Sequence, residues 1–165
     1  MKITIIFAVI ILSCSSVFAN HTVFTIERNK NANVVYYDAN ITDKKIDEKN
    51  PIDAYWLLHA IDGRREELSA FEKKAYGFKT KHTNEKHFEL ALKAVEDRAI
   101  KLFTHNGLAV AEITINNKKA YLKKVYVFSK DGMLGIPKVY YYILHGIDPE
   151  TGQEVSEKIE LKKDK

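Results

Sequence analysis

Two stretches of the sequence place a histidine and an aspartate in an apolar, aromatic segment: YWLLHAIDG at residues 55–63 and YYILHGIDP at residues 141–149. A histidine beside a carboxylate is a common arrangement for general acid–base catalysis, so His59 with Asp62 is the first pair to consider. Each stretch has the composition of a strand that ends in a turn, and successive side chains of a strand point to opposite faces. His59 and Asp62 are therefore expected to point apart, and the second stretch repeats this spacing.

Each aspartate is better explained as the first residue of a turn, where its carboxylate accepts backbone N–H groups. His59 is expected to be a half-buried strand residue whose ring is hydrogen-bonded to a neighbour. The neighbouring tyrosines can stack on sugars or line a cavity, although core packing is the commoner role of such rings. We assign no catalytic residue, and four residues form a candidate ligand-binding site: Tyr55, His59, Tyr141 and His145.

Other patterns of catalysis or metal binding are weak. His82 and His87 are five residues apart, which suits neither one helix face nor one strand face, and an H-E-x-x-H motif is absent. The sequence also lacks a G-x-S-x-G motif and a glycine-rich phosphate loop. Ser69 falls in a predicted helix, where a capping or packing role is expected. We expect no metal and no cofactor.

The chain has 165 residues and a formal net charge of +4, with charges of both signs interspersed. This mildly basic composition does not indicate nucleic-acid binding. Two lysine-rich segments, 73–86 and 118–124, suit either a solvated face or contact with an anionic envelope surface or polysaccharide. The length suits one domain with its own core. No apolar run beyond the N-terminal segment approaches the length of a membrane span.

Residues 1–19 have the pattern of a secretory signal peptide, with Lys2 followed by an apolar stretch and small residues. Cleavage after Ala19 would leave residues 20–165 as a single β-rich domain. A lipobox-like sequence ending at Cys14 offers the alternative of a lipid-anchored N-terminus. Cys14 is the only cysteine, so a chain cleaved after Ala19 has no disulfide and no thiolate site. Both alternatives predict an exported protein that is periplasmic, secreted or lipid-anchored.

The elements that must position these residues are mostly strands. Segments rich in β-branched and aromatic residues alternate with turn signals such as Asn106-Gly107 and the pair Asn116-Asn117, which tolerates positive φ. One helix is expected over residues 64–78, where apolar residues recur near helical spacing, and the polar residues 42–51 are expected to be a connection. This order predicts an antiparallel β-barrel or sandwich, a meander of about eight to nine strands with one helix packed on it. The expected strands cover residues 21–29, 33–41, 52–61, 87–95, 99–104, 108–115, 119–129, 138–147 and 154–161.

Two regions of the sequence show a family resemblance. The first contains Asn33, Val34, Val35, Tyr36, Asn50, Pro51, Tyr55, Trp56, Gly63, Leu68, Ala75, Tyr76 and Gly77, and the second contains Gly146, Thr151, Gly152 and Glu157. At these positions the chain resembles an exported bacterial family known only as a domain of unknown function, DUF4833. The resemblance implies a bacterial, exported, single-domain protein, and it implies no activity and no site.

We therefore expect an exported, non-catalytic protein of the bacterial envelope or secretions. Its ligand is expected to be a small apolar molecule, a glycan or an envelope partner. The alternative is a hydrolase of envelope polymers whose histidine, tyrosine and carboxylate side chains come together only in the fold. A histidine close to a carboxylate in an open cleft would favour the hydrolase, whereas a filled core with an exposed Tyr/Lys face would favour the binding protein.

Overall fold

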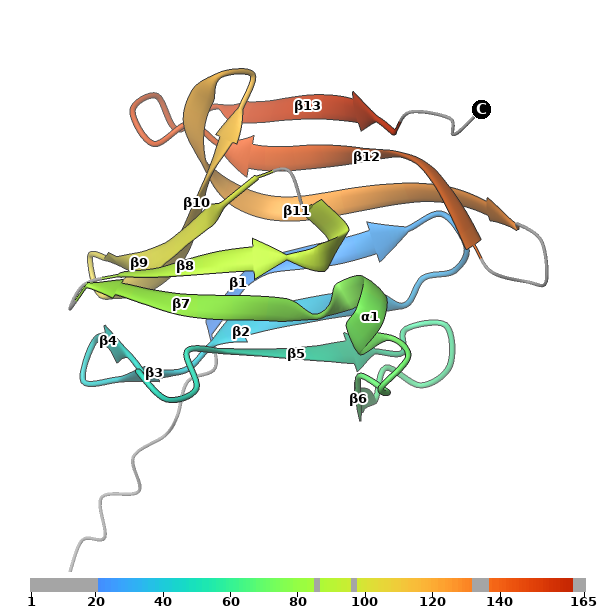
Figure 1. Ribbon diagram of the computed structural model, residues 1–165, viewed down its shortest axis with the longest axis horizontal. Coiled ribbons are helices and arrows are strands. Elements are labelled where there is room, and N and C mark those ends of the chain that lie inside the picture. Colours follow the sequence, from blue (N-terminus) through green and yellow to red (C-terminus); the bar gives the residue numbers. More distant parts are fainter. Residues whose placement is uncertain (1–20, 85–86, 96–97, 132–136, 162–165) are drawn as a thin grey trace, which may run out of the picture.

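The computed structural model describes residues 21–84, 87–95, 98–131 and 137–161 (Figure 1). The predicted signal peptide and Cys14 lie outside these residues. The described chain is mainly β with one short α-helix, which confirms the predicted fold class. No helix of the described part is long and apolar enough to cross a membrane. The elements are β1 (His21–Arg28), β2 (Val34–Ala39), β3 (Ile41–Thr42), β4 (Lys45–Ile46), β5 (Ile52–Leu57), β6 (Arg65–Glu67), α1 (Lys73–Tyr76), β7 (Phe78–Asn84), β8 (His87–Leu92), the 3-10 turn η1 (Lys93–Val95), β9 (Ile100–His105), β10 (Leu108–Ile115), β11 (Lys118–Asp131), β12 (Pro137–Ile147) and β13 (Glu154–Glu160).

The long strand β11 determines the shape of the main sheet. One edge of β11 pairs with β10 through residues 118–121 and then with β1 through residues 124–127. Its other edge pairs with β12 through residues 121–131, and β13 continues from β12. Because two strands share one edge, the sheet curls into a half-barrel with the order β6-β5-β2-β1-β11-β10-β9-β8-β7. The β1–β11 pair is parallel, so the sheet is mixed and not the purely antiparallel one predicted.

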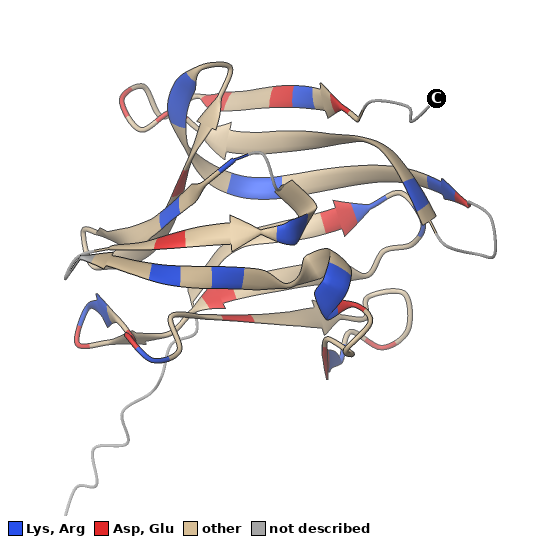
Figure 2. Cartoon of the chain, viewed as in Figure 1, with Lys and Arg blue, Asp and Glu red and all other residues tan. Residues whose placement is uncertain are grey.

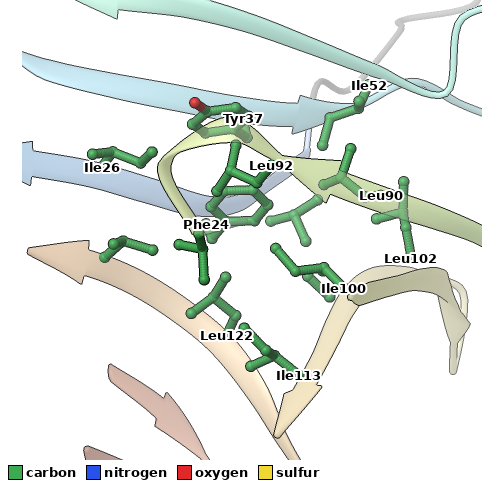
Figure 3. Packing of buried hydrophobic residues seen from close by; sticks show 14 of the residues in the cluster. Phe24, Ile26, Tyr37, Ile52, Leu90, Leu92, Ile100, Leu102, Ile113 and Leu122 are labelled. Carbon is green, nitrogen blue, oxygen red and sulfur yellow. The ribbon is translucent and has the colours of Figure 1, made fainter. Parts of the chain in front are cut away.

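The core lies between the two layers of this curled sheet. Figure 3 shows Phe24 and Tyr37 from β1 and β2 facing Leu90 and Leu92 from β8. The Tyr37 ring stacks on Phe24 with the ring centroids 4.4 Å apart, and its hydroxyl donates to the backbone carbonyl of Tyr76 at 2.6 Å. Burying a large apolar side chain of this kind stabilises the fold by about 1.5–3 kcal/mol. The alternating burial along β8 confirms the strand predicted from residue 87, but that strand ends at Leu92 and residues 93–95 form η1.

Two-residue turns with positive φ join several strands. Asn106-Gly107 has φ values of 53° and 79°, and Asn116-Asn117 has 50° and 62°, as type I′ hairpin turns require. Both were predicted from the residue types. Asp43-Lys44 adopts the same conformation, with φ values of 50° and 63°, and joins β3 to β4. The prediction that residues 42–51 hold no strand was therefore wrong, because Asp-Lys is a weak turn signal and buried Ile46 supplies the anchor.

The helix predicted over residues 64–78 is wrong for most of its length. Its first part forms the edge strand β6, which pairs with β5, and the helix α1 spans only Lys73–Tyr76. The glutamates and arginines of this segment favour helix locally. Backbone hydrogen bonds to the exposed edge of β5 outweigh that preference, as sheet pairing often does.

Strand β5 ends earlier than predicted, at Leu57. A turn follows, in which the N–H groups of Ile61 and Gly63 both donate to the carbonyl of Leu58, at 2.9 and 3.0 Å. Gly63 has a φ of 75°, which a residue with a side chain adopts only with strain. His59 therefore lies in a turn and is exposed, not half-buried in a strand as predicted.

Glu72 fastens the loop between β6 and α1 to the core. Its carboxylate accepts the indole N–H of Trp56 at 2.9 Å and the backbone N–H and hydroxyl of Ser69 at 2.8 and 2.7 Å. The Ser69 hydroxyl oxygen accepts the Glu72 N–H at 3.3 Å, so the two residues form a reciprocal capping box and the capping role predicted for Ser69 is confirmed. Although burial acts to raise it, the pKa of Glu72 is lowered by these hydrogen bonds and by the charge of Arg28.

A second anchor joins β13 to the rest of the sheet. The Arg98 guanidinium donates to both carboxylate oxygens of Glu157, at 2.7 and 2.6 Å, and the backbone N–H of Asn116 donates to the same carboxylate at 2.6 Å. Arg98 also donates to the carbonyl of Thr114 at 2.6 Å. The hydrogen bonds from Arg98, followed by that from Asn116, lower the pKa of Glu157 from its ordinary 4.5 to about 2.

Replacing Glu72 by alanine should lower the free energy of unfolding by about 1–3 kcal/mol, because the Trp56 indole N–H loses its acceptor. Urea unfolding followed by the fluorescence of Trp56, the only tryptophan, measures the change. Glu66→Ala is the matched control, since Glu66 is exposed and its one ion pair with a described residue, Arg64, is 3.8 Å long. Equal stability of the two variants would contradict the anchoring role of Glu72.

Glu157→Gln should remove a contribution to stability that depends on pH. The folded-state pKa of Glu157 is about 2, below its ordinary 4.5, so this contribution is complete above pH 4.5 and disappears as the pH falls towards 2. Urea unfolding between pH 2 and 6 should therefore show the largest difference from the unaltered protein above pH 4.5. Glu150→Gln, at an exposed position, is the control. A difference that stays constant across this range would contradict the assignment.

Candidate functional site

A pocket of about 810 Å³ opens at one end of the molecule, between the β3–β4 hairpin and the ends of β7, β8 and β9. Figure 1 shows this hairpin at the left, below the tips of the three strands. We call this cavity the end pocket, and its volume is typical of ligand pockets. Its lining consists of Asp43, Lys44, Lys45, Ile46, Glu48, His82, His87, Phe88, Lys101, Phe103 and Thr104.

The hairpin that forms one wall of the end pocket is held by hydrogen bonds at its base. The Asp47 carboxylate accepts the backbone N–H groups of Lys49 and Asn50, at 2.7 and 2.9 Å. The backbone N–H of Asp47 donates to the Asn40 carbonyl at 2.8 Å, and the Asn40 side chain donates to the Asn50 carbonyl at 2.9 Å. The N–H groups of Asn50 and Lys49 lower the pKa of Asp47. The hairpin is therefore fixed at its base as well as by Ile46.

The opposite wall of the end pocket presents aromatic rings. The imidazole of His82 stacks on Phe88, with the ring centroids 4.8 Å apart and the planes at 18°. The Lys101 ammonium lies 5.4 Å from the centroid of the Phe103 ring, within cation–π range. Phe88 is buried while Phe103 is only partly so. Phe88 pairs with Leu102 and Phe103 pairs with His87, so the lining takes rings from both faces of the sheet edge. The exposed His82 and the partly buried Phe103 can each offer a face to an apolar or sugar ring.

The charged part of the lining has an excess of lysines. The lining contains three lysines, Lys44, Lys45 and Lys101, and two acidic residues, Asp43 and Glu48. None of these five residues forms an ion pair with another described residue. Figure 2 shows charges of both signs on both layers of the protein, so this excess is local. The end pocket combines cationic donors with aromatic faces, which suits a polar ring that bears hydrogen-bond acceptors.

The sequence indicated this site only indirectly. The five-residue spacing of His82 and His87 argues against a metal pair. In the structure His82 lies opposite Phe88 across the β7–β8 hairpin. Among the described residues, no group of three or more His, Cys, Asp or Glu side chains is arranged to hold a metal ion. The end pocket exists because a hairpin distant in sequence approaches β9, and no local pattern reports that approach.

Two of the predicted site residues lie in one row across the outer face of the sheet, away from the core. Paired residues of successive strands form this row, which we call the transverse row: Glu67, Tyr55, Tyr36, Thr25, Lys124, His145 and Ser156. Tyr55 and His145 are thus on the same face, separated by the strands that hold Tyr36, Thr25 and Lys124. Three strands therefore lie between Tyr55 and His145. Since neighbouring strands are about 4.8 Å apart, the two side chains are too far apart to touch.

Tyr55 is fixed within the protein and is not free to bind a ligand through its hydroxyl. That hydroxyl donates to the buried Asp38 carboxylate at 2.6 Å, and Thr22 donates to the same carboxylate at 2.8 Å. Burial and the hydrogen bond with Asp38 raise the pKa of Tyr55. The Arg65 guanidinium lies 3.7 Å from the centre of the Tyr55 ring and covers one face. These contacts hold the Tyr55 hydroxyl and ring in place.

His59 and Tyr141 have different surroundings. The His59 ring lies 6.3 Å from the Tyr36 ring and is tilted to it. The Tyr141 ring stacks on Phe128 at 4.8 Å, with the planes at 4°, and the Lys158 ammonium lies 4.2 Å from its centroid. The four residues proposed from the sequence therefore do not form one cluster.

Both aspartates of the two histidine stretches belong to turns, as predicted. Asp62 accepts the N–H of Arg64 at 3.0 Å, and Asp148 accepts those of Glu150 and Thr151 at 2.8 and 3.1 Å. The backbone N–H groups of Glu150 and Thr151 lower the pKa of Asp148. Neither aspartate is paired with the nearby histidine.

His145 lines a second pocket of about 410 Å³ on the outer face, which we call the sheet-face pocket. Lys124 and Ser156 flank His145 on the neighbouring strands. The Lys124 ammonium lies 3.3 Å from the Glu27 carboxylate. Burial, followed by the charge of Lys124, lowers the pKa of His145. Of the four predicted site residues, His145 is thus the one that lines either of these two pockets.

The fold also explains a glycine of the sheet-face pocket. A Cβ atom on Gly146 would lie 2.9 Å from the Tyr121 carbonyl oxygen and 2.9 Å from the Ile115 side chain. Only glycine therefore lets β12 lie this close to the β10–β11 hairpin. Gly146 is among the residues on which the family resemblance rests, and its role is packing.

The comparisons with known proteins agree with the resemblance seen in the sequence. The model of a family described as a domain of unknown function (DUF4833) matches residues 24–158, most of the chain. No curated protein and no solved structure matches the sequence significantly. The chain is therefore a member of the DUF4833 family.

Proposed function

We propose that this protein is an exported bacterial protein of the envelope or secretions that binds a small glycan in the end pocket without acting on it chemically. The single observation that supports this most is the end pocket itself, whose lining combines three lysines with the rings of His82, Phe88 and Phe103. Its volume of about 810 Å³ suits a ligand of one to a few sugar rings.

A glycan matches the end pocket better than a purely apolar ligand does. The ring faces of Phe103 and His82 can stack against the C–H face of a sugar, while Thr104 and the lysines reach its oxygens. The exposed ammonium groups of Lys45 and Lys101 can donate to the oxygens of a sugar, whereas an apolar ligand offers them no acceptor. The lysine excess further favours a sugar that bears a carboxylate.

The exported location is supported by residues 1–19, whose composition is that of a signal peptide. A hydrolase of envelope polymers was the alternative, and it would need a histidine close to a carboxylate. Among the described residues, neither His59 nor His145 forms a hydrogen bond with a carboxylate. Among the described carboxylates, Glu27 and Glu154 act on the His145 ring through their charges only.

Calorimetric titration with neutral and uronic-acid-containing oligosaccharides tests this function. The double variant Lys45→Gln with Lys101→Gln should weaken binding of an acidic oligosaccharide about tenfold or more, because charge-assisted hydrogen bonds contribute about 1.5–3 kcal/mol each. Phe103→Leu should weaken binding of both kinds, since it removes a stacking face but keeps an apolar side chain. Lys79→Gln with Lys138→Gln, two exposed positions outside the end pocket, is the matched control.

Three outcomes would contradict the proposal. The first is that no oligosaccharide binds at millimolar concentration. The second is that the control variant weakens binding as much as the end-pocket variant. The third is that chromatography finds the oligosaccharide cleaved after incubation, which would rule out the non-catalytic role.

A further inference from the structure

The sheet-face pocket is built around a β-bulge in β11. Leu122 pairs with Gly146 and Lys124 pairs with His145. Gly146 and His145 are consecutive in β12, so Lys123 is an extra residue that has no pairing partner there. A bulge of this kind redirects a side chain that regular pairing would send to the opposite face. Both Lys123 and Lys124 consequently line the same pocket, together with His145.

Hydrogen-bond donors outnumber acceptors among the side chains of this pocket. Lys123, Lys124, His145 and Ser156 can all donate, and Glu154 is the acidic residue of the lining. Within the described part of the chain, the Lys123 ammonium and the His145 ring make no hydrogen bond or ion pair. Because donors exceed acceptors in this pocket, a ligand that supplies hydrogen-bond acceptors would complement it.

The contact between Lys124 and Glu27 is weak enough to be exchanged for a ligand. The two groups are 3.3 Å apart, and their side chains are 37% and 38% exposed. Ion pairs as exposed as this contribute little to stability, because water screens the charges. A ligand that brings its own negative charge can therefore replace Glu27 at little cost.

We propose that the sheet-face pocket binds an oxyanion, the carboxylate or phosphate group of a ligand, between Lys123, Lys124, His145 and Ser156. The site is separate from the end pocket and does not depend on the function proposed for it. Lysine and histidine side chains that converge from adjacent strands give two charge-assisted contacts and an imidazole N–H, while the Ser156 hydroxyl completes the set. The bulge distinguishes this arrangement from an ordinary solvated lysine face, where each lysine points to its own region of solvent.

The surroundings of His145 supply a direct readout. Lys124, Glu27 and Glu154 are the charged groups that act on its ring, and burial together with Lys124 lowers its pKa. A bound oxyanion adds negative charge beside the ring and must raise that pKa. An NMR pH titration of the six histidine rings, with His145 assigned by the loss of its signal in His145→Gln, follows this shift in the purified protein.

The titration is run with inorganic phosphate and with acetate, at constant ionic strength set by sodium chloride. We expect a saturable increase in the His145 pKa with at least one of the two anions. A response to phosphate alone indicates a site for a phosphate group, and a response to acetate alone indicates a site for a carboxylate. A response to both anions indicates an oxyanion site that does not distinguish the two groups. No saturable response to either anion would overturn the proposal.

Variants assign the response to the pocket. Lys123→Gln removes an exposed charge with no partner among the described residues, so it should leave the fold intact and weaken the anion affinity about tenfold. Lys138→Gln, on β12 outside both pockets, and Lys45→Gln, in the end pocket, should leave the affinity unchanged. An equal loss of affinity in either control would show a response to net charge alone and would overturn the site.

Discussion

The shared edge of β11 is the constraint on which the rest of the structure depends. Because β10 and β1 pair with successive parts of one edge, the sheet has to curl and its two layers have to face each other across the core. This curl brings the end of β2, from which the β3–β4 hairpin extends, close to β9 and so creates the end pocket. The opposite edge of β11 carries the bulge at Lys123 and with it the sheet-face pocket.

The sequence predicts those parts of the fold in which local chemistry determines the structure. Alternating side chains and positive-φ turn residues identify β8 to β11 and the hairpins at Asn106-Gly107 and Asn116-Asn117. Local composition fails where pairing partners are distant in sequence. The segment at 65–67 contains helix-favouring residues but joins the edge of β5, and no local pattern reports the parallel pairing of β1 with β11. The pockets depend on these distant contacts, so the residues that the fold places around His145 could not be predicted from the sequence.

Residues that show the family resemblance mainly hold the fold together. Trp56 binds Glu72, Gly63 adopts a positive φ, Glu157 accepts three hydrogen bonds, and Gly146 permits the close approach of β12. None of these residues lines the end pocket, and only Gly146 lines the sheet-face pocket. Membership of the family therefore accounts for the architecture, whereas the proposed binding functions rest on the charge and shape of the two pockets.

Glycan binding in the end pocket is the central claim, and a map of backbone amide chemical shifts during titration with an oligosaccharide tests it most directly. The proposal predicts that the largest changes occur at the amides of Lys45, His82 and Phe103, from three strands that only the fold brings together. Changes confined to β12 and β13, or changes spread evenly over the surface, would contradict it.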